Sequence, residues 1–371
     1  MFRQDLARTH YNFGILYRES NRPAEAEQVL RRAIELLRPL ANDEPSNASG
    51  SQELARAHLN LGSVLRFLKR HTESVGHCDE AIRLLSKLSQ RSPDRADLPF
   101  ELAVAHTNRG NLRQNLGQKS AAAEDYALAC TLFQKLTTNH PHVPAIRQEL
   151  ANSYNSLAAI QAATEGLPAG EKTWLEAVTI LRDLVARHDS VAAYRGDLGM
   201  TLGNLGWVLA RQGRWSEARE SLREGVEQLE SVLSSNPAHP DYRHSLRSQL
   251  RQLAQVSLDL GDYESAAITA RRLCPIGETT PADAVVSGCL MLRSALLAEH
   301  DDTIVEAERV QRVDQYCSDA ASVLAQATGR GHSDLPQLAQ LRELVIPRLV
   351  SHPTLGDAWR AFAADEKSPT P

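Results

Sequence analysis

Residues 54–62 read Leu54-Ala-Arg-Ala-His-Leu-Asn-Leu-Gly62, and closely similar segments occur 48 residues before and 48 residues after them. The earlier segment is Leu6-Ala-Arg-Thr-His-Tyr-Asn-Phe-Gly14, and the later one is Leu102-Ala-Val-Ala-His-Thr-Asn-Arg-Gly110. The opening leucine recurs at the same interval at Leu150, Leu198 and Leu246. A fixed period of this kind is the sequence signature of a repeat protein. The spacing therefore predicts six repeats, numbered 1 to 6 below, that run through about residue 275.

Each repeat is expected to contain two helices. In repeat 1, apolar residues fall at helical spacing over residues 6–19 and again from Pro23 to Leu40. Proline suits the first turn of a helix, so Pro23 marks the start of the second one. The break between the two helices falls at a residue that tolerates the left-handed conformation ending a helix. These break residues are Asn21, Gly117, Gly213 and Gly261.

Small residues recur in each repeat at fixed positions. In repeat 1 they are Gly14, Ala26 and Ala33, which lie 12 and then 7 residues apart. Small side chains let two helices approach closely. This spacing resembles that of the tetratricopeptide repeat, whose usual length is about 34 residues, so the present repeat is a variant extended to 48. The resemblance implies an all-α, right-handed superhelical solenoid of antiparallel helix pairs that binds other proteins.

A second resemblance concerns the particular amino-acid sequence of the repeats. The segment 54–62 and the closing stretch from Tyr316 to Phe362 are similar to the repeat arrays that follow the kinase domain in large planctomycete-type bacterial serine/threonine kinases. This implies an alternative function as the regulatory or substrate-docking region, or a detached fragment, of such a kinase. The chain itself has no Gly-rich phosphate loop, no His-Arg-Asp with a downstream Asn and no Asp-Phe-Gly, so we expect it not to be an enzyme.

The composition narrows the class of partner. The 371 residues include 41 basic and 46 acidic ones, for a net charge of −5, whereas a nucleic-acid binder normally has a basic excess. No apolar run approaches the ~18 residues of a membrane helix, and the N-terminus lacks an apolar signal core. The five cysteines are too scattered for a disulfide framework or a zinc site. We therefore expect a cytoplasmic protein without cofactor or metal, whose partners are neither nucleic acids nor membranes.

The first helices should line the concave face, as the resemblance implies. Their inward positions are rich in arginine in the N-terminal repeats and in amides in the middle, and repeat 5 adds a tryptophan. Arginines attract an acidic or phosphorylated segment through charge-assisted hydrogen bonds, and a tryptophan on a groove is a natural anchor. The alternative is an ordinary solvated groove with scattered charges. The candidates for partner binding on this face are Arg8, Tyr11, Arg18, Arg56, Arg66, Asn111, Asn155, Trp207 and Arg211.

Asparagine fills one first-helix position in four of the six repeats, at Asn12, Asn60, Asn108 and Asn204. Asparagine is mildly unfavourable inside a helix, so a column of four needs a reason. One interpretation is a row of amides that hydrogen-bonds the backbone of an extended peptide. The other is a hydrogen bond between neighbouring repeats. Both remain open from the sequence.

Two further repeat positions contain charged or titratable residues. Arg109 stands where the other repeats have Phe13 or leucine, so its guanidinium needs a partner, and Asp125 and Glu124 are the candidates. We also count Arg109 among the candidates for partner binding. His10, His58 and His106 form a ladder, but no carboxylate or cysteine column completes a metal site, which favours a packing role.

The two ends of the chain differ. Residues 281–299 and 303–327 are expected to form a helix pair, with Asp301-Asp302 as a start signal. Residues 334–349 and 355–363 would add two shorter helices, so that residues 276–364 form a degenerate cap and 365–371 a disordered tail. At the other end, the first helix begins in mid-pattern with exposed apolar residues. This predicts that the chain continues a longer protein, or that its N-terminal edge docks on another domain or on a second copy.

Overall fold

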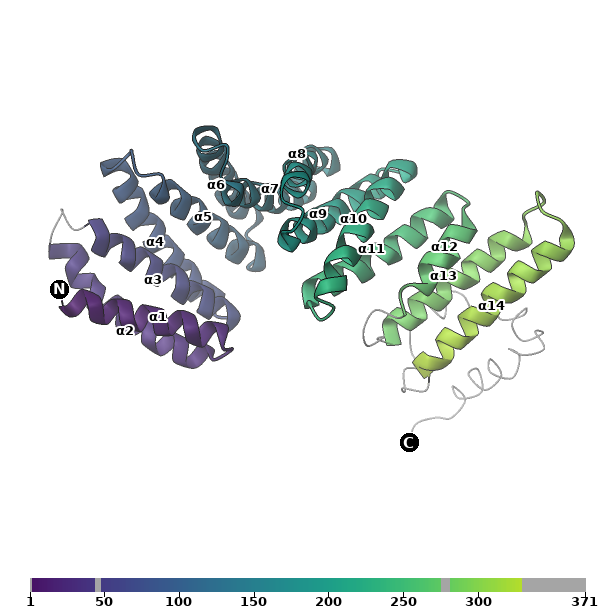
Figure 1. Ribbon diagram of the computed structural model, residues 1–371, viewed down its shortest axis with the longest axis horizontal. Helices are drawn as coiled ribbons and strands as arrows, with labels where there is room; N and C mark the ends of the chain where they lie inside the picture. Colours follow the sequence, from purple (N-terminus) through teal and green to yellow (C-terminus); the bar gives the residue numbers. More distant parts are fainter. Residues whose placement is uncertain (1, 44–47, 275–280, 329–371) are drawn as a thin grey trace. The chain divides into compact units, whose positions relative to one another are not determined.

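The computed structural model describes residues 2–43, 48–274 and 281–328, and no β-strand occurs within these ranges (Figure 1). The described residues form fourteen helices. They are α1 (Phe2–Glu19), α2 (Pro23–Asp43), α3 (Ala48–Phe67), α4 (His71–Arg91), α5 (Asp97–Asn115), α6 (Lys119–Asn139), α7 (Pro144–Thr164), α8 (Leu167–Arg187), α9 (Ala192–Arg211), α10 (Trp215–Ser235), α11 (Pro240–Asp259), α12 (Tyr263–Arg271), α13 (Pro281–Glu299) and α14 (Glu306–Thr328). The all-α prediction is confirmed.

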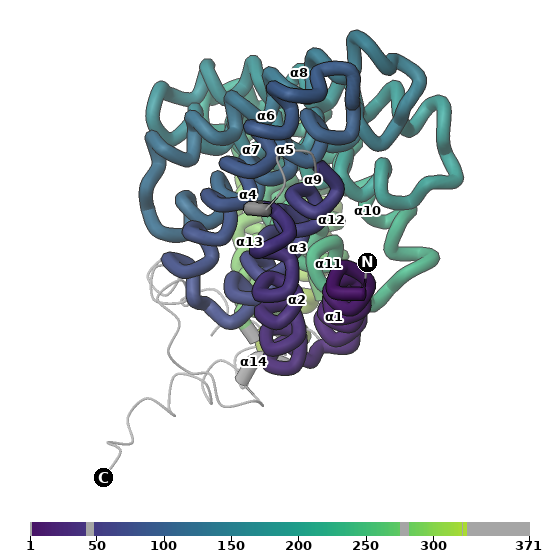
Figure 2. The backbone as a smooth tube through the Cα atoms, turned by 90° about the vertical axis from the view of Figure 1, so that its left-hand side faces the viewer, coloured from purple at the N-terminus to yellow at the C-terminus, as the bar shows by residue number. Residues whose placement is uncertain are grey.

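The chain divides into two compact units at the boundary between Arg187 and His188, which coincides with the boundary between repeats 4 and 5. Unit 1 contains α1 to α8, and unit 2 contains α9 to α14. Within each unit the helices pack as successive pairs. Within a unit, each second helix also packs on the first helix of the following pair, as α2 does on α3 and α10 on α11. At the N-terminal end of unit 1, α1 lies beside α2 and α3 (Figure 2).

In repeats 1, 3, 5 and 6 the turn between the two helices forms at the predicted break residue. Asn21, Gly117, Gly213 and Gly261 all have positive φ, between 56° and 76°. In repeat 1 the amide of Arg22 donates to the carbonyl of Tyr17 (2.8 Å), which closes the helix end in the Schellman pattern. Repeat 2 places Lys69 at this position with φ 61°, although a lysine side chain disfavours the left-handed region.

The small columns set how closely the two helices of a pair pack. A Cβ atom added to Gly14 would lie 2.5 Å from Leu30 Cγ, and one added to Gly206 would lie 2.6 Å from Leu222 Cγ. Gly110 is similarly covered by the ring of Tyr126. In repeats 1, 3 and 5 the large residue of the second helix therefore occupies the space that the glycine of the first helix leaves, which confirms the packing role predicted for these columns.

The C-terminal part follows the prediction with one difference. The expected helix pair forms as α13 and α14, but α14 begins at Glu306 and not directly after Asp301-Asp302. The Asp301 carboxylate instead accepts a hydrogen bond from the amide of Thr303 (2.9 Å), so this start signal forms a turn before the helix. The helices predicted over 334–349 and 355–363 and the tail 365–371 lie outside the described residues.

Candidate partner-binding site

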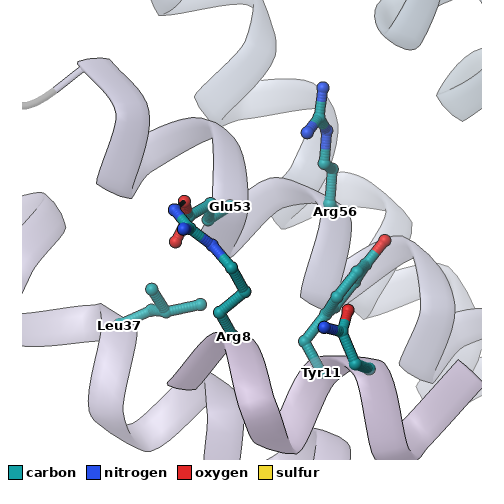
Figure 3. A pocket seen from close by; sticks show the side chains of 6 residues that line it. Arg8, Tyr11, Leu37, Glu53 and Arg56 are labelled. Carbon is teal, nitrogen blue, oxygen red and sulfur yellow. Dashed lines mark hydrogen bonds and ion pairs between the residues drawn. The ribbon is translucent and has the colours of Figure 1, made fainter. Parts of the chain in front are cut away.

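A pocket of about 340 Å³ opens on the first helices of repeats 1 and 2, in unit 1. Its lining consists of Arg8, Tyr11, Asn12, Leu37, Glu53 and Arg56 (Figure 3). Four of these six residues are among the candidates that the sequence predicted. Arg8 and Tyr11 extend from α1, Glu53 and Arg56 from α3, and Leu37 from α2. The pocket therefore spans two neighbouring repeats.

Ion pairs between repeats hold the two arginines of the pocket. Arg8 Nη2 donates to Glu53 Oε1 (2.5 Å), and one repeat later Arg56 Nε donates to Glu101 Oε1 (2.9 Å). The side chains of Arg8 and Arg56 are 55% and 45% exposed, against 18% and 15% for Glu53 and Glu101. Each carboxylate is thus more buried than the guanidinium that it binds, and each arginine side chain keeps about half of its surface exposed. A guanidinium has five N–H donors, so each arginine can bind a second anionic group.

Tyr11 connects the pocket to the asparagine column. Asn60 Nδ2 donates to the Tyr11 hydroxyl oxygen (3.0 Å), and Arg18 Nη1 donates to Asn60 Oδ1 (2.8 Å). Burial raises the pKa of Tyr11, so its hydroxyl stays protonated at neutral pH and keeps a donor of its own. Asn60 therefore links repeats 1 and 2, which is the second of the two interpretations that the sequence left open. Asn12, in contrast, is exposed and lines the pocket.

Two candidates on α5 and α7 form hydrogen bonds within their own repeats. Asn111 Oδ1 accepts a hydrogen bond from the Tyr126 hydroxyl (2.7 Å), and Asn155 Oδ1 accepts one from Trp174 Nε1 (2.8 Å). Each of these bonds joins the first helix of a repeat to its second helix. Asn108 is half-buried on α5. Arg66, which is exposed at the C-terminal end of α3, does not line the pocket.

Arg109 belongs to a buried charge cluster. Its Nη2 donates to Asp125 Oδ1 (2.6 Å) and its Nη1 to Asp79 Oδ1 (2.6 Å), which confirms the predicted Asp125 partner. Asp125 is fully buried, and it also accepts from Arg113 Nη1 (2.8 Å) and pairs with His106 Nδ1 (2.9 Å). Burial alone would raise the pKa of Asp125, but the bonds to His106 and Arg109 and the nearby positive charges lower it.

The histidine column contacts the second helix of its repeat. His58 Nδ1 lies 2.8 Å from His77 Nδ1, as His106 lies against Asp125, so both residues contact the position 19 residues later. Burial, together with the charge that His77 would carry, lowers the pKa of His58 to about 4. Within the described residues, no group of three or more His, Cys, Asp or Glu side chains is arranged to hold a metal ion.

Unit 2 carries a separate group of candidates on α9. Asn204, Trp207 and Arg211 are all exposed, and their spacing places them on neighbouring parts of one helix face. The Trp207 side chain is 42% exposed, and the Arg211 guanidinium lies 6.0 Å from the centre of its ring. The cation–π contact holds the arginine over an aromatic surface that remains open to solvent.

Glu53 and Leu37 line the pocket but were not predicted from the sequence. Glu53 has a signal, because an acidic residue recurs at its position in Asp5, Glu101, Glu149 and Asp197. An acidic column 45 residues after an arginine would have indicated the pairs between repeats. Leu37 is a core leucine by pattern, and only the packed structure shows that it also forms a pocket wall.

Family models of the tetratricopeptide repeat match residues 7–36 and 198–241. Among solved structures, BtubC (BKLC) from P. vanneervenii is similar with a TM-score of 0.50 and 18% identity, covering 67% of this chain and 89% of that one. The apo form of RapI also gives a TM-score of 0.50, with 11% identity, covering 88% of this chain and 99% of that one. A comparison with curated proteins gives no match.

These comparisons, together with the packed helix pairs, define the class of the molecule. It is a helical-repeat protein. Tetratricopeptide-repeat models match one segment in each of the two units. Within the described residues, no helix is long and apolar enough to cross a membrane.

Proposed function

We propose that this chain is a non-catalytic scaffold that binds an extended or helical segment of a partner protein along its first helices, on the concave face that the repeat resemblance implies. The observation that carries the proposal is the pocket between α1 and α3, where two half-exposed arginines flank Tyr11. Charge-assisted hydrogen bonds to carboxylate or phosphate are the strong interactions of such arginines. The partner segment is therefore acidic or phosphorylated.

The pocket suits an anchor better than an open groove would. Leu37 forms an apolar wall, while Arg8, Arg56 and the Tyr11 hydroxyl supply donors. Because Glu53 and Glu101 hold the two guanidinium groups in place, little side-chain entropy is lost when a ligand binds. Asn12, exposed at the pocket, adds an amide that can pair with the backbone of an extended peptide. Trp207 with Arg211 in unit 2 is a second candidate anchor.

A peptide selection tests this function directly. We expect peptides selected from a random library by the full chain to be enriched in aspartate, glutamate or phosphoserine. Arg8→Gln or Arg56→Gln should weaken their binding about tenfold or more in a fluorescence anisotropy titration, since each removes a charge-assisted contact. Trp207→Ala tests the second anchor in the same assay.

Arg83→Gln is the matched control. Arg83 is an equally exposed arginine that pairs with Glu80 on the second helix α4, away from the pocket. Peptides that show no acidic preference, or that bind Arg56→Gln and Arg83→Gln equally well, would exclude the pocket as the anchor. Melting temperatures of all variants must be compared first, because Arg8 and Arg56 also pair with half-buried glutamates.

The alternative function is that of a regulatory or substrate-docking region of a bacterial serine/threonine kinase. This alternative rests on the sequence of residues 54–62 and on that of the stretch from Tyr316 to Phe362. The coding sequence around the chain tests it: an in-frame kinase domain upstream supports this role, and a stop codon directly upstream contradicts it.

A further inference from the structure

One face of α1 is exposed, although most of the equivalent positions in the later repeats are buried. The residues Phe2, Leu6, Thr9, Phe13 and Leu16 follow a 4-3-4-3 spacing, which places them in one stripe along the helix. We name these five residues the α1 edge stripe. Phe2 is 91% exposed, and Leu6, Phe13 and Leu16 are between 43% and 52% exposed. Such a continuous apolar stripe marks a surface for interaction.

The later repeats show what normally covers this stripe. The positions equivalent to Leu6 and Leu16 are buried in all five later repeats, as Leu54 and Val64 illustrate for repeat 2. Within each unit, the preceding second helix packs on these first helices and covers them, as α2 does on α3 and α10 on α11. The Thr9 position gives a specific contact: Gln249 on α11 donates to the carbonyl of Gly199 (2.8 Å) and lies against Gly225 of α10. The covering helix therefore presents a small residue opposite this position, and Ala33 is its equivalent in α2.

Charges on α1 and α2 lack the partners that their equivalents have. Asp5 stands at the position of Glu53, which accepts from Arg8 of the preceding repeat, and Asp5 is exposed. Arg22 and Glu25 stand at the positions of Arg70 and Glu73. Within the part of the chain that the structure describes, Arg22 and Glu25 pair only with each other among ionised groups (2.9 Å).

In repeat 2, the equivalent charges make pairs across the repeat boundary. Arg70 bonds both oxygens of Glu27 (2.8 Å each), and Glu73 pairs with Arg31. The same boundary position is used with reversed signs in unit 2, where Arg219 pairs with Asp262 (3.4 Å). The positive charge of Arg22 therefore requires an acidic residue on the helix that covers it.

We infer that the α1 edge stripe is a docking surface for a helical hairpin of the same repeat type, supplied as a partner to the N-terminal edge of unit 1. The hairpin carries a small residue and leucines on its second helix to cover Thr9 and the apolar stripe. It carries an arginine to pair with Asp5, and a glutamate and an arginine, four residues apart, to pair with Arg22 and Glu25. Apolar contacts supply most of the affinity, and the three charges fix the register. This edge is separate from the Arg8 pocket, so the inference does not depend on the proposed function.

The probe for this docking surface is an added copy of residues 1–48 joined in register ahead of Met1 of the full chain. The added copy contains Arg8, Glu27, Arg31 and Ala33, which are the residues that the edge requires. We expect amide hydrogen exchange of the original residues 2–19 to slow by about tenfold or more and the melting temperature to rise by several degrees.

A pair of matched variants separates docking from the mere addition of helix. Phe13→Ser with Leu16→Ser in the original α1 should leave the unextended chain nearly unchanged, because both side chains are exposed, yet it should abolish the gain in the extended chain. Reversing Glu27 and Arg31 in the added copy keeps their own i, i+4 pair but opposes Arg22 and Glu25 with like charges, and it should reduce the gain.

Two results would overturn the inference. The first is an extended chain whose original α1 exchanges as fast as before. The second is an unextended chain that sediments as a dimer and becomes monomeric with Phe13→Ser and Leu16→Ser, because the stripe would then be covered by a second copy. Unchanged peptide binding at the Arg8 pocket in these variants shows that the two surfaces act separately.

Discussion

At the scale of single residues, the ion pairs of the buried Asp125 carboxylate contribute to the stability of repeat 3. This carboxylate has no exposed surface, and Arg109, Arg113 and His106 surround it. Arg109→Leu restores the leucine found at this position in repeats 2, 4, 5 and 6, but it leaves a buried charge with one partner fewer. We expect the free energy of unfolding to fall by about 3 kcal/mol, since breaking a buried pair from one side is costly. Urea denaturation measures this change.

The control for that variant replaces both partners. Repeats 4 and 6 have threonine at the position of Asp125, so Arg109→Leu with Asp125→Thr reproduces a pattern that the chain already tolerates. The double variant should recover much of the lost stability. A single variant that is as stable as the parent, with weakened peptide binding, would instead assign Arg109 to the partner surface.

The His58–His77 contact predicts acid sensitivity. The pKa of His58 is lowered to about 4 in the folded chain by burial and by His77, against 6.5 for an ordinary histidine. Between these two pH values the unfolded chain binds a proton that the folded chain does not, so the stability present above pH 6.5 is lost as the pH falls. From pH 7 to pH 5 the loss at His58 is about 2 kcal/mol.

Denaturation curves at several pH values test this sensitivity. His58→Leu with His77→Val copies the residues at these positions in repeats 5 and 1 and should flatten the pH dependence over this range. An unchanged slope in the double variant would place the acid-sensitive group elsewhere.

At the scale of the elements, the turn between α3 and α4 places a lysine, rather than a glycine or asparagine, in the left-handed region. Lys69 has φ 61°, where the corresponding residue of repeats 3, 5 and 6 is glycine. Lys69→Gly removes the steric conflict of the side chain in the left-handed region and should stabilise the chain by about 1 kcal/mol. Gly117→Lys at the equivalent turn should destabilise it by a similar amount. Thermal melts of the two variants that shift in the same direction would contradict this account.

The elements also show which features of the fold and the site can be predicted from the sequence. The helix pairs and the turns at Asn21 and Gly117 follow from local chemistry, because the 48-residue period aligns weak signals from six repeats. The site was predicted only in part: Arg8 and Arg56 follow from the pattern, whereas Leu37 enters the pocket through packing. Arg109 shows a different limit. From the sequence, its exceptional position fitted either a contact with a partner protein or a buried ion pair with Asp125 or Glu124. Only the structure shows the buried pair with Asp125.

At the scale of the whole molecule, each unit is built from contacts between neighbouring repeats, and the register of these contacts can be tested. Each interface within a unit joins a second helix to the next first helix, as α2·α3 and α4·α5 do. Stability in such an array is close to a sum of repeat and interface contributions. Removing a whole period should therefore leave matching interfaces, whereas removing a different length should not.

Deletion of residues 49–96, which is one period, would place α5 directly after α2. Arg8 would then face Glu101, which stands at the position of Glu53, and the small Ala33 would face Ala105, which stands at the position of Ala57. We expect this shortened chain to keep its helical circular dichroism per residue and to unfold cooperatively. A deletion of residues 49–98 removes 50 residues, two more than a period, and at about 100° per residue it turns the following apolar stripe by roughly 160° away from α2. It should lose cooperative unfolding, and equal behaviour of the two deletions would mean that the interfaces do not depend on the 48-residue register.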